Sequence, residues 1–275
     1  MNNNLPKLLA VLVNYGNEQI SFLEKVVKEL KSFEKFDVTV IVNSNIDLNI
    51  EEIDKVNTLT LPDYQLLPLT CRSVIWENRN DYDVFIYGEN DHLFLERHIE
   101  KHIEYSNILP KNKISGLIQF EENETGKYYP AFHAKYNWDL KSVKEYGGKK
   151  FAHFTNVHQA SFILTKEQML RAGANFDFLK LVNENTLLNK IKRELCKFGF
   201  KIERQDNKYS VKCKVNTDVY LYGGMKKMIC ISEFNDNLIH HLPNLYIDGK
   251  AGRLKLRADE NKMDDSIKRL LNHKS

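Results

Sequence analysis

The sequence lacks any apolar run long enough to cross a bilayer, since none approaches the roughly 20 residues that a membrane-spanning helix needs. It also lacks the pattern of a signal peptide. Residues 1–6 are polar and include no basic segment followed by an apolar core. We therefore expect a cytoplasmic protein.

Paired cysteine motifs are absent as well. The four cysteines show no CxxC spacing, which argues against a zinc ribbon and against a thioredoxin-like redox motif. In a cytosolic protein such residues are usually buried and reduced. We expect this state for all of them: Cys71, Cys196, Cys213 and Cys230.

A strong excess of one charge sign is missing too. The 40 basic and 37 acidic side chains leave a formal net charge of +3, which is too small to indicate a nucleic-acid partner. The 275 residues are 42% hydrophobic and 28% charged. This length and composition predict one large globular domain with a modest C-terminal extension.

The first part of the chain alternates between strand and helix patterns. Residues 8–15 and 38–42 are short apolar runs, typical of strands buried on both faces. Between them, residues 22–33 carry apolar side chains at helical spacing with a charged opposite face. This strand–helix–strand unit predicts a parallel sheet. A weaker strand at 56–61 and a fourth at 83–87 extend it.

Later elements are less regular. Residues 121–150 show little periodicity, and we expect loops and short strands there that cover the site. Thr165 followed by Gln168 matches a capping box at the start of a helix. The other expected elements are helices at 65–79, 95–105, 166–172 and 185–198, the last with its apolar side chains inward, and strands at 114–120 and 156–165.

The end of the chain, residues 251–275, is strongly charged and poor in aromatic side chains. We expect a solvated tail in which residues 266–271 form an amphipathic helix. A peripheral contact between this tail and the inner membrane surface is the alternative interpretation.

Polar clusters follow three of the expected strands. Ligands bind outside the carboxyl ends of the strands in an open parallel sheet, so these clusters should converge on one site. The third cluster, Glu89-Asn90-Asp91, holds two carboxylates, which are ligands that Mg²⁺ or Mn²⁺ accepts beside phosphates and water. A polar β-turn is the other interpretation of this segment. The clusters are Asn14-Tyr15, Asn43-Ser44-Asn45 and Glu89-Asn90-Asp91.

Three ordered segments resemble a family of GT-A-fold glycosyltransferases. Residues 81–91 (DYDVFIYGEND) are similar to a YD-x-F-x-Y-x-E-D-D segment, and residues 156–165 (NVHQASFILT) to an N-P-H-Q-x-x-x-x-L-T segment. Residues 240–246 (HHLPNLY) resemble HHLPNKY, and Cys71-Arg72 stands where the family often has His-Arg. Asn90 departs from the pattern, because it replaces the middle carboxylate of the acidic motif.

The resemblance implies a Rossmann-type, mostly parallel sheet flanked by helices. Residues 1–250 would form one GT-A-like domain, with a nucleotide-binding half to about residue 110 and an acceptor half over about 111–250. It also implies a set of nucleotide-binding residues. Tyr15 would stack on the base, with a packing tyrosine as the alternative. Arg72 would reach the diphosphate, with a place on an exposed helix face as the alternative. This set is Asn14, Tyr15, Asn43, Arg72, Glu89 and Asn90.

The same resemblance implies a divalent cation, Mn²⁺ or Mg²⁺, held first by Asp91 and second by Glu89. His241 or His240 would add an imidazole, and adjacent residues of an extended segment point in opposite directions, so only one of the two can face the cation.

For the acceptor, the resemblance implies contacts from His158 and Gln159, with ordinary loop hydrogen bonding as the alternative. An inverting transfer needs a carboxylate base beside the acceptor hydroxyl. Glu184 is the first candidate, although an acidic residue at a helix start also compensates the helix dipole. Asp177 is the second candidate.

The function expected from these patterns is transfer of a sugar from a nucleotide-diphosphate donor, UDP-sugar first, to a glycan or lipid-linked glycan in surface polysaccharide synthesis. A Mg-dependent nucleotidyltransferase is a rival interpretation, but residues 13–17 lack a glycine-rich phosphate loop. The other rival is a nucleotide- or sugar-binding module with a decayed metal site, to which Asn90 points.

Overall fold

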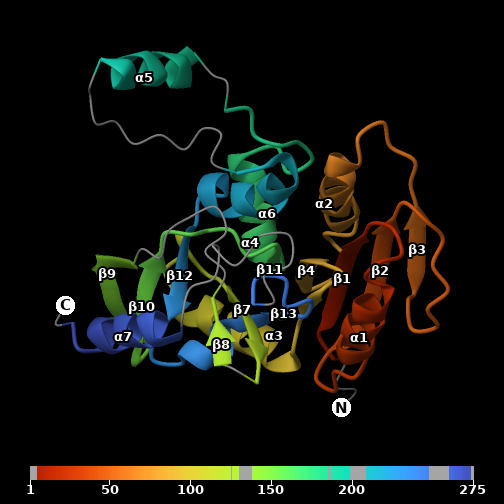
Figure 1. Ribbon diagram of the computed structural model, residues 1–275, viewed down its shortest axis with the longest axis horizontal. Coiled ribbons are helices and arrows are strands. Elements are labelled where there is room, and N and C mark those ends of the chain that lie inside the picture. The colour runs from red at the N-terminus through yellow and green to blue at the C-terminus, as the bar shows by residue number, and fades with distance from the viewer. Residues whose placement is uncertain are drawn as a thin grey trace.

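A computed structural model describes residues 5–124, 126–129, 138–184, 187–198, 209–247 and 260–273. Within them the chain has a mixed α/β architecture of parallel and mixed sheets flanked by helices (Figure 1). The strands are β1 (Lys7–Asn14), β2 (Asp37–Ser44), β3 (Lys55–Thr58), β4 (Val84–Glu89), β5 (His92–Leu93), β6 (Lys113–Ser115), β7 (Ile118–Asn123), β8 (Gly126–Tyr128), β9 (Trp138–Tyr146), β10 (Lys149–Phe154), β11 (Ser161–Thr165), β12 (Lys226–Cys230) and β13 (Leu238–His241). The helices are α1 (Ile20–Lys31), α2 (Leu67–Glu77), α3 (Glu96–Ile108), α4 (Lys166–Asn175), α5 (Leu187–Lys197), α6 (Val211–Tyr222) and α7 (Glu260–Leu271), with 3-10 turns η1 (Tyr64–Leu66) and η2 (Phe234–Asn237).

The first sheet has the strand order β11-β4-β1-β2-β3. β1 pairs in parallel with β2 and β4, and β2 pairs in parallel with β3, so the predicted parallel sheet is confirmed. β11 joins the other side of β4 in the antiparallel direction. The capping box before α4 is confirmed as well, since Thr165 and Gln168 exchange hydrogen bonds between side chain and backbone.

Both faces of this sheet are buried, which explains why β1 is an unbroken apolar run. Leu8, Ala10 and Leu12 pack on one side in a core with α1. Leu9 and Val11 pack on the other side in a core with α2, α4 and α6. The sheet is therefore fixed between two helix layers, and its carboxyl-terminal edge is a rigid base for side chains.

Two smaller sheets follow, with strand orders β6-β12-β10-β9 and β5-β13-β7-β8. β9 and β10 form an antiparallel hairpin where we expected loops and short strands. Gly147 and Gly148 connect them with φ values of +54° and +76°. Two consecutive positive φ values match the tight turn that suits a two-residue hairpin.

α6 was not predicted because it has no polar face. Its side chains are buried on nearly all sides, from Cys213 to Tyr220, so no helical alternation of apolar and polar residues marks it. The expected state of the cysteines is confirmed for three of them, because Cys71, Cys213 and Cys230 are buried thiols. The side chain of Cys196 lies outside the described part.

The expectation of a solvated tail is wrong for residues 260–273. α7 buries Met263, Ile267 and Leu270 in a core with β9, β10 and β12. Its amphipathic pattern thus serves packing on the body of the protein. In the described ranges, no helix has the length and apolar character required to cross a membrane.

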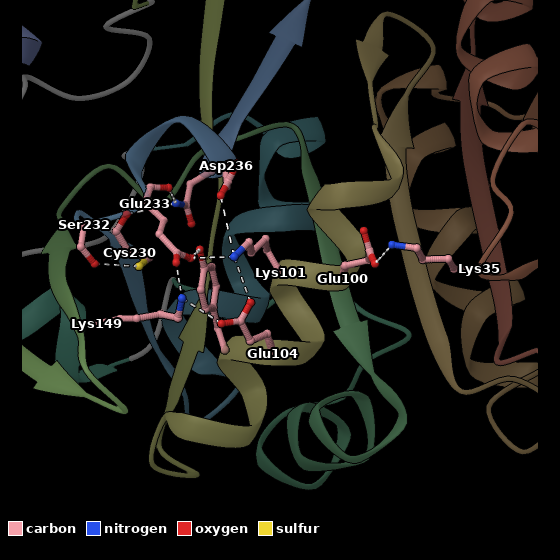
Figure 2. Close-up of polar contacts among 11 residues, drawn as sticks. Lys35, Glu100, Lys101, Glu104, Lys149, Cys230, Ser232, Glu233 and Asp236 are labelled. Atoms are coloured by element: carbon pink, nitrogen blue, oxygen red, sulfur yellow. Dashed lines mark hydrogen bonds and ion pairs between the residues drawn. The ribbon is translucent and has the colours of Figure 1, made fainter.

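A charged network ties α3 to β10 and η2 (Figure 2). The Glu233 carboxylate contacts Lys101 Nζ at 2.9 Å, Lys149 Nζ and the Tyr105 hydroxyl, which donates at 2.8 Å. Burial alone would raise the pKa of Glu233, but the lysines and Tyr105 outweigh it and lower the pKa to about 2. The ionised Glu233 carboxylate therefore links α3, through Lys101 and Tyr105, to the start of β10, through Lys149.

Candidate functional site

The carboxyl ends of β1, β2 and β4 converge at one edge of the first sheet, as predicted. Asn14 Nδ2 donates to Ser44 Oγ at 3.2 Å, and Asn90 Nδ2 donates to Asn14 Oδ1 at 2.7 Å. Gly16 N donates to Asn45 Oδ1 at 2.7 Å. Asn14 and Asn90 are buried, so these bonds fix the edge on which the acidic residues stand.

Asp91 lies just beyond β4, beside the two-residue strand β5. Its Oδ1 is 2.8 Å from His92 Nδ1, and its Oδ2 accepts from Gln19 Nε2 at 3.2 Å. Although close, Asp91 Oδ1 and His92 Nδ1 are both buried without a hydrogen-bond partner of suitable geometry in the described residues. Ligand atoms of Glu89, Asp91 and His92 lie within 4.8 Å of one another. This spacing suits a shared cation.

His241 reaches Asp91 from the C-terminal part of the chain. β13 pairs with β5 so that His241 stands opposite His92, and His241 Nε2 lies 3.4 Å from Asp91 Oδ2. The Leu242 N–H donates to the Asp91 carbonyl at 2.9 Å and locks this approach.

The other nitrogen of His241, Nδ1, is 2.6 Å from Glu121 Oε1. Glu121 is fully buried, and its Oε2 accepts from the backbone N–H groups of Tyr246 and Ile247 at 2.9 Å each. Because a carboxylate only accepts, His241 Nδ1 carries a proton. The Glu121 carboxylate thus orients the ring so that Nε2 faces Asp91.

His240 points the other way, as the alternation along a strand requires. Its ring stacks on Phe120 with centroids 4.8 Å apart. Of the two histidines, His241 is therefore the one that faces Asp91.

The charged side chains of the site shift the pKa values of Asp91, Glu89 and His241. Burial alone would raise the pKa of Asp91, but the imidazoles of His92 and His241 outweigh burial and hold it well below its usual range. Burial and the Asp91 charge raise the pKa of Glu89. Burial lowers the pKa of His241, yet contacts with Asp91 and Glu121 raise it overall to about 9. Asp91 is therefore ionised at neutral pH.

An open cleft of about 570 Å³ lies against this edge. Tyr15, which is 62% exposed, and Tyr64 stand at its mouth with ring centroids 5.4 Å apart. Lys212, at the start of α6, brings a positive charge to the same cleft as Glu89. The lining side chains are Val13, Tyr15, Glu18, Gln19, Asp63, Tyr64, Gln65, Leu67, Pro68, Glu89, Asn90, Lys212 and Leu245.

The diphosphate role of Arg72 is wrong. Arg72 is fully buried, and its guanidinium donates to the carbonyls of Asp177, Phe178 and Lys180. It also lies 3.8 Å from the buried carboxylate of Asp218. All of these partners are protein groups, so Arg72 fastens the segment after α4 to α2 instead of binding a ligand.

The direct nucleotide contacts expected from Asn14 and Asn43 are also corrected. Asn14 is buried and bonded within the strand edge described above. Asn43 is buried too. Its amide donates to Thr70 Oγ1 at 2.7 Å and accepts from Asn57 Nδ2 at 2.9 Å. Asn14 is not among the lining side chains, and Asn43 lines a different hollow, between β3 and α2.

Neither candidate for the catalytic base lines the cleft. The Glu184 carboxylate pairs with Lys214 Nζ at 3.0 Å and accepts from the Tyr222 hydroxyl at 3.3 Å. Asp177 pairs with Lys180 on the surface at 2.9 Å. The structure therefore brings neither carboxylate to the cleft, and the role of either as the base stays a prediction.

The acceptor contact expected from Gln159 is wrong as well. Gln159 is fully buried, its Oε1 accepts from Leu117 N, and its Nε2 donates to the Tyr220 hydroxyl. His158 lies beside Asn216, whose Nδ2 is 3.4 Å from His158 Nδ1. His158 does not line the cleft either.

Four residues of the site were missed. His92 directly follows the acidic motif, so its position was a usable signal. Glu121, Gln19 and Lys212 carried none, because each reaches the site through a contact between segments far apart in the chain.

No known family model matches the chain, and a comparison with curated proteins likewise finds no match.

Proposed function

We propose that this chain transfers a sugar from a nucleoside diphosphate donor, with a divalent cation at Asp91. The observation that carries the proposal is the buried set of Asp91, His92 and His241 at the carboxyl edge of a parallel sheet. Asp91 contacts Gln19, which lines the neighbouring cleft together with Glu89, Asn90 and the exposed ring of Tyr15. Ligands of open α/β sheets bind at such an edge. The strand order, with an antiparallel strand next to β4, is consistent with the GT-A-like arrangement that the motifs suggest.

The residues present fit a divalent cation. Asp91 Oδ1 and His92 Nδ1 are buried, adjacent and without hydrogen-bond partners among the described residues, so a shared ligand would satisfy both. Asp91 and Glu89 supply hard oxygen donors, and His241 supplies an imidazole whose orientation Glu121 fixes. When bound, the cation neutralises charge that develops on the diphosphate as the glycosidic bond breaks.

The cleft supplies groups for the nucleotide. The exposed ring of Tyr15, with Tyr64 beside it, offers a surface on which a base stacks. Gln65 and Glu18 line the same cleft and offer hydrogen-bonding groups for base and ribose. Lys212 takes the place that we expected for Arg72, because it brings a cationic side chain to the cleft beside Glu89.

Asn90 does not argue for a decayed site. Its amide donates to the buried Asn14 Oδ1, a bond that an aspartate could not make. Asn90 therefore has a structural role, because its amide holds the ends of β1 and β4 together. The proposed cation donors, Glu89 and Asp91, lie on either side of it. This favours an active transferase over a binding module.

Release of nucleoside diphosphate from a panel of UDP- and GDP-linked sugars tests the proposal. We expect release that requires Mn²⁺ or Mg²⁺ and that falls on the order of 10²-fold or more in Asp91→Asn. Asp37→Asn, which changes an exposed aspartate at the start of β2, is the matched control and should keep the full rate. Full activity of the wild type in EDTA would contradict the role of the cation. If no donor releases its nucleotide, the proposed enzymatic activity is contradicted.

A further inference from the structure

α5 leaves its apolar side chains in solvent. Leu187, Ile191, Leu195 and Phe198, which follows its last residue, are 75%, 48%, 37% and 79% exposed. Steps of four, four and three residues place them along one side of a helix. The sequence predicted this amphipathic helix, but the expectation that its apolar side faces the core is wrong.

Other amphipathic helices of the protein bury their apolar side. α1 buries Leu23, Val26 and Leu30, and α7 buries Met263 and Leu270. α5 instead stands apart from the sheets and from the other helices, at the top of Figure 1. An exposed apolar strip on one helix, when comparable helices are packed, marks a surface that binds something.

The charge of α5 identifies what it binds. The segment from Leu187 to Lys197 contains four basic residues, Lys190, Lys192, Arg193 and Lys197, and one acidic residue, Glu194. The net charge of this segment, four minus one, is +3, as large as that of the whole 275-residue chain, so α5 is much more basic than the chain average. A second copy of this helix would bring like charges together, whereas an anionic lipid surface is complementary to it.

We propose that α5 docks on an anionic phospholipid surface, with Leu187, Ile191 and Phe198 entering the boundary between headgroups and acyl chains. The helix has 11 residues, well short of the roughly 20 needed to cross a bilayer, so it lies in the plane of the surface. The membrane contact that was the alternative interpretation of the tail is thus proposed for α5 instead, since α7 packs on the body of the protein. The proposal stands on α5 alone and does not depend on the proposed enzymatic activity.

Co-sedimentation of the full chain with vesicles tests this. One set of vesicles is phosphatidylcholine alone, and the other is phosphatidylcholine and phosphatidylglycerol in equal parts. We expect binding to the anionic vesicles only, and weaker binding as salt is raised. The double variant Ile191→Ser/Phe198→Ser should lose binding at least tenfold, as should Lys192→Glu/Lys197→Glu. Leu170→Ser, at a 41% exposed leucine of α4, is the matched control and should bind like the wild type.

Two outcomes would overturn the proposal. One is no binding of the wild type to anionic vesicles, or equal binding by the Ile191→Ser/Phe198→Ser variant. The other is a dimer that the wild type forms without lipid, as seen by sedimentation, and that the Ile191→Ser/Phe198→Ser variant does not form. This result would show that the apolar side of α5 binds a second copy of the chain. Circular dichroism and thermal unfolding in lipid-free solution, compared with the wild type, show that each variant is folded.

Discussion

His241 Nδ1 lies 2.6 Å from Glu121 Oε1, and this contact turns Nε2 of the same ring toward Asp91, 3.4 Å away. The Glu121 carboxylate is itself held by two backbone N–H groups, so the ring has a fixed support on the side away from the cleft. The same geometry is used where a carboxylate orients a metal-binding histidine. Glu121 is therefore a positioning residue, because it acts on the site through His241.

Glu121→Gln should weaken Mn²⁺ binding about 10- to 100-fold, because the amide no longer fixes the orientation and basicity of His241. Calorimetric titration with Mn²⁺ measures this. Glu122→Gln, at the exposed neighbouring residue, should bind Mn²⁺ like the wild type. If Glu121→Gln is folded by circular dichroism and binds Mn²⁺ unchanged, Glu121 has only a structural role.

Placing a third carboxylate in the acidic segment by Asn90→Asp should destabilise the protein and not improve the proposed cation site. The new carboxylate would face Asn14 Oδ1 in a buried position and lose a hydrogen bond of 2.7 Å. We expect a loss of about 1–3 kcal/mol in the free energy of unfolding. Urea denaturation checks this, with Asn80→Asp at an exposed asparagine as control. A variant of normal stability with tighter Mn²⁺ binding would contradict the role given to Asn90.

Arg72→Met should cost stability while the folded protein keeps its nucleotide affinity. The change leaves the buried carboxylate of Asp218 without its guanidinium and releases three backbone carbonyls. Breaking such a buried pair costs about 3–5 kcal/mol. Denaturation curves measure the loss, and UDP titration well below the melting temperature measures affinity. Loss of UDP binding in a folded variant would return Arg72 to the nucleotide site.

The Glu233 network predicts a dependence of stability on pH. The pKa of Glu233 is about 2 in the folded protein against an ordinary 4.5. Its stabilising contribution is therefore fully present above about pH 4.5 and is lost as the pH falls toward 2. We expect Glu233→Gln to lower the free energy of unfolding by about 1–2 kcal/mol at neutral pH, allowing for the partial exposure of the side chain.

The difference between Glu233→Gln and the wild type should shrink steadily once the pH falls below 4.5. Urea denaturation across this range measures it, with Glu145→Gln as a control at an exposed glutamate. A difference that does not change with pH would show that the network contributes through packing and not through charge.

The sequence predicted the first sheet well because its signals are local. Apolar runs such as residues 8–15 and the helical spacing of 22–33 identify elements without knowledge of their partners. α6 escaped prediction for the opposite reason, since a helix buried on nearly all sides has no periodic pattern. The hairpin of β9 and β10 did carry a signal, the pair Gly147-Gly148, which was not used.

The site was predicted in part. Asp91, Glu89 and His241 lie together as expected, because strand ends and one motif fix their places. Arg72 and Gln159 were misassigned, because the sequence does not show whether a polar side chain faces a ligand or bonds to backbone groups in the core. Glu121 could not be found from the chain alone, because 120 residues separate it from His241.

Calorimetric titration of UDP into the protein, with and without Mn²⁺, tests the central claim most directly. The proposal predicts that Mn²⁺ and UDP each tighten binding of the other, because they share the site between Asp91 and the cleft, and that Asp91→Asn removes this coupling. UDP that binds with the same affinity in EDTA, in Mn²⁺ and in Asp91→Asn would contradict it.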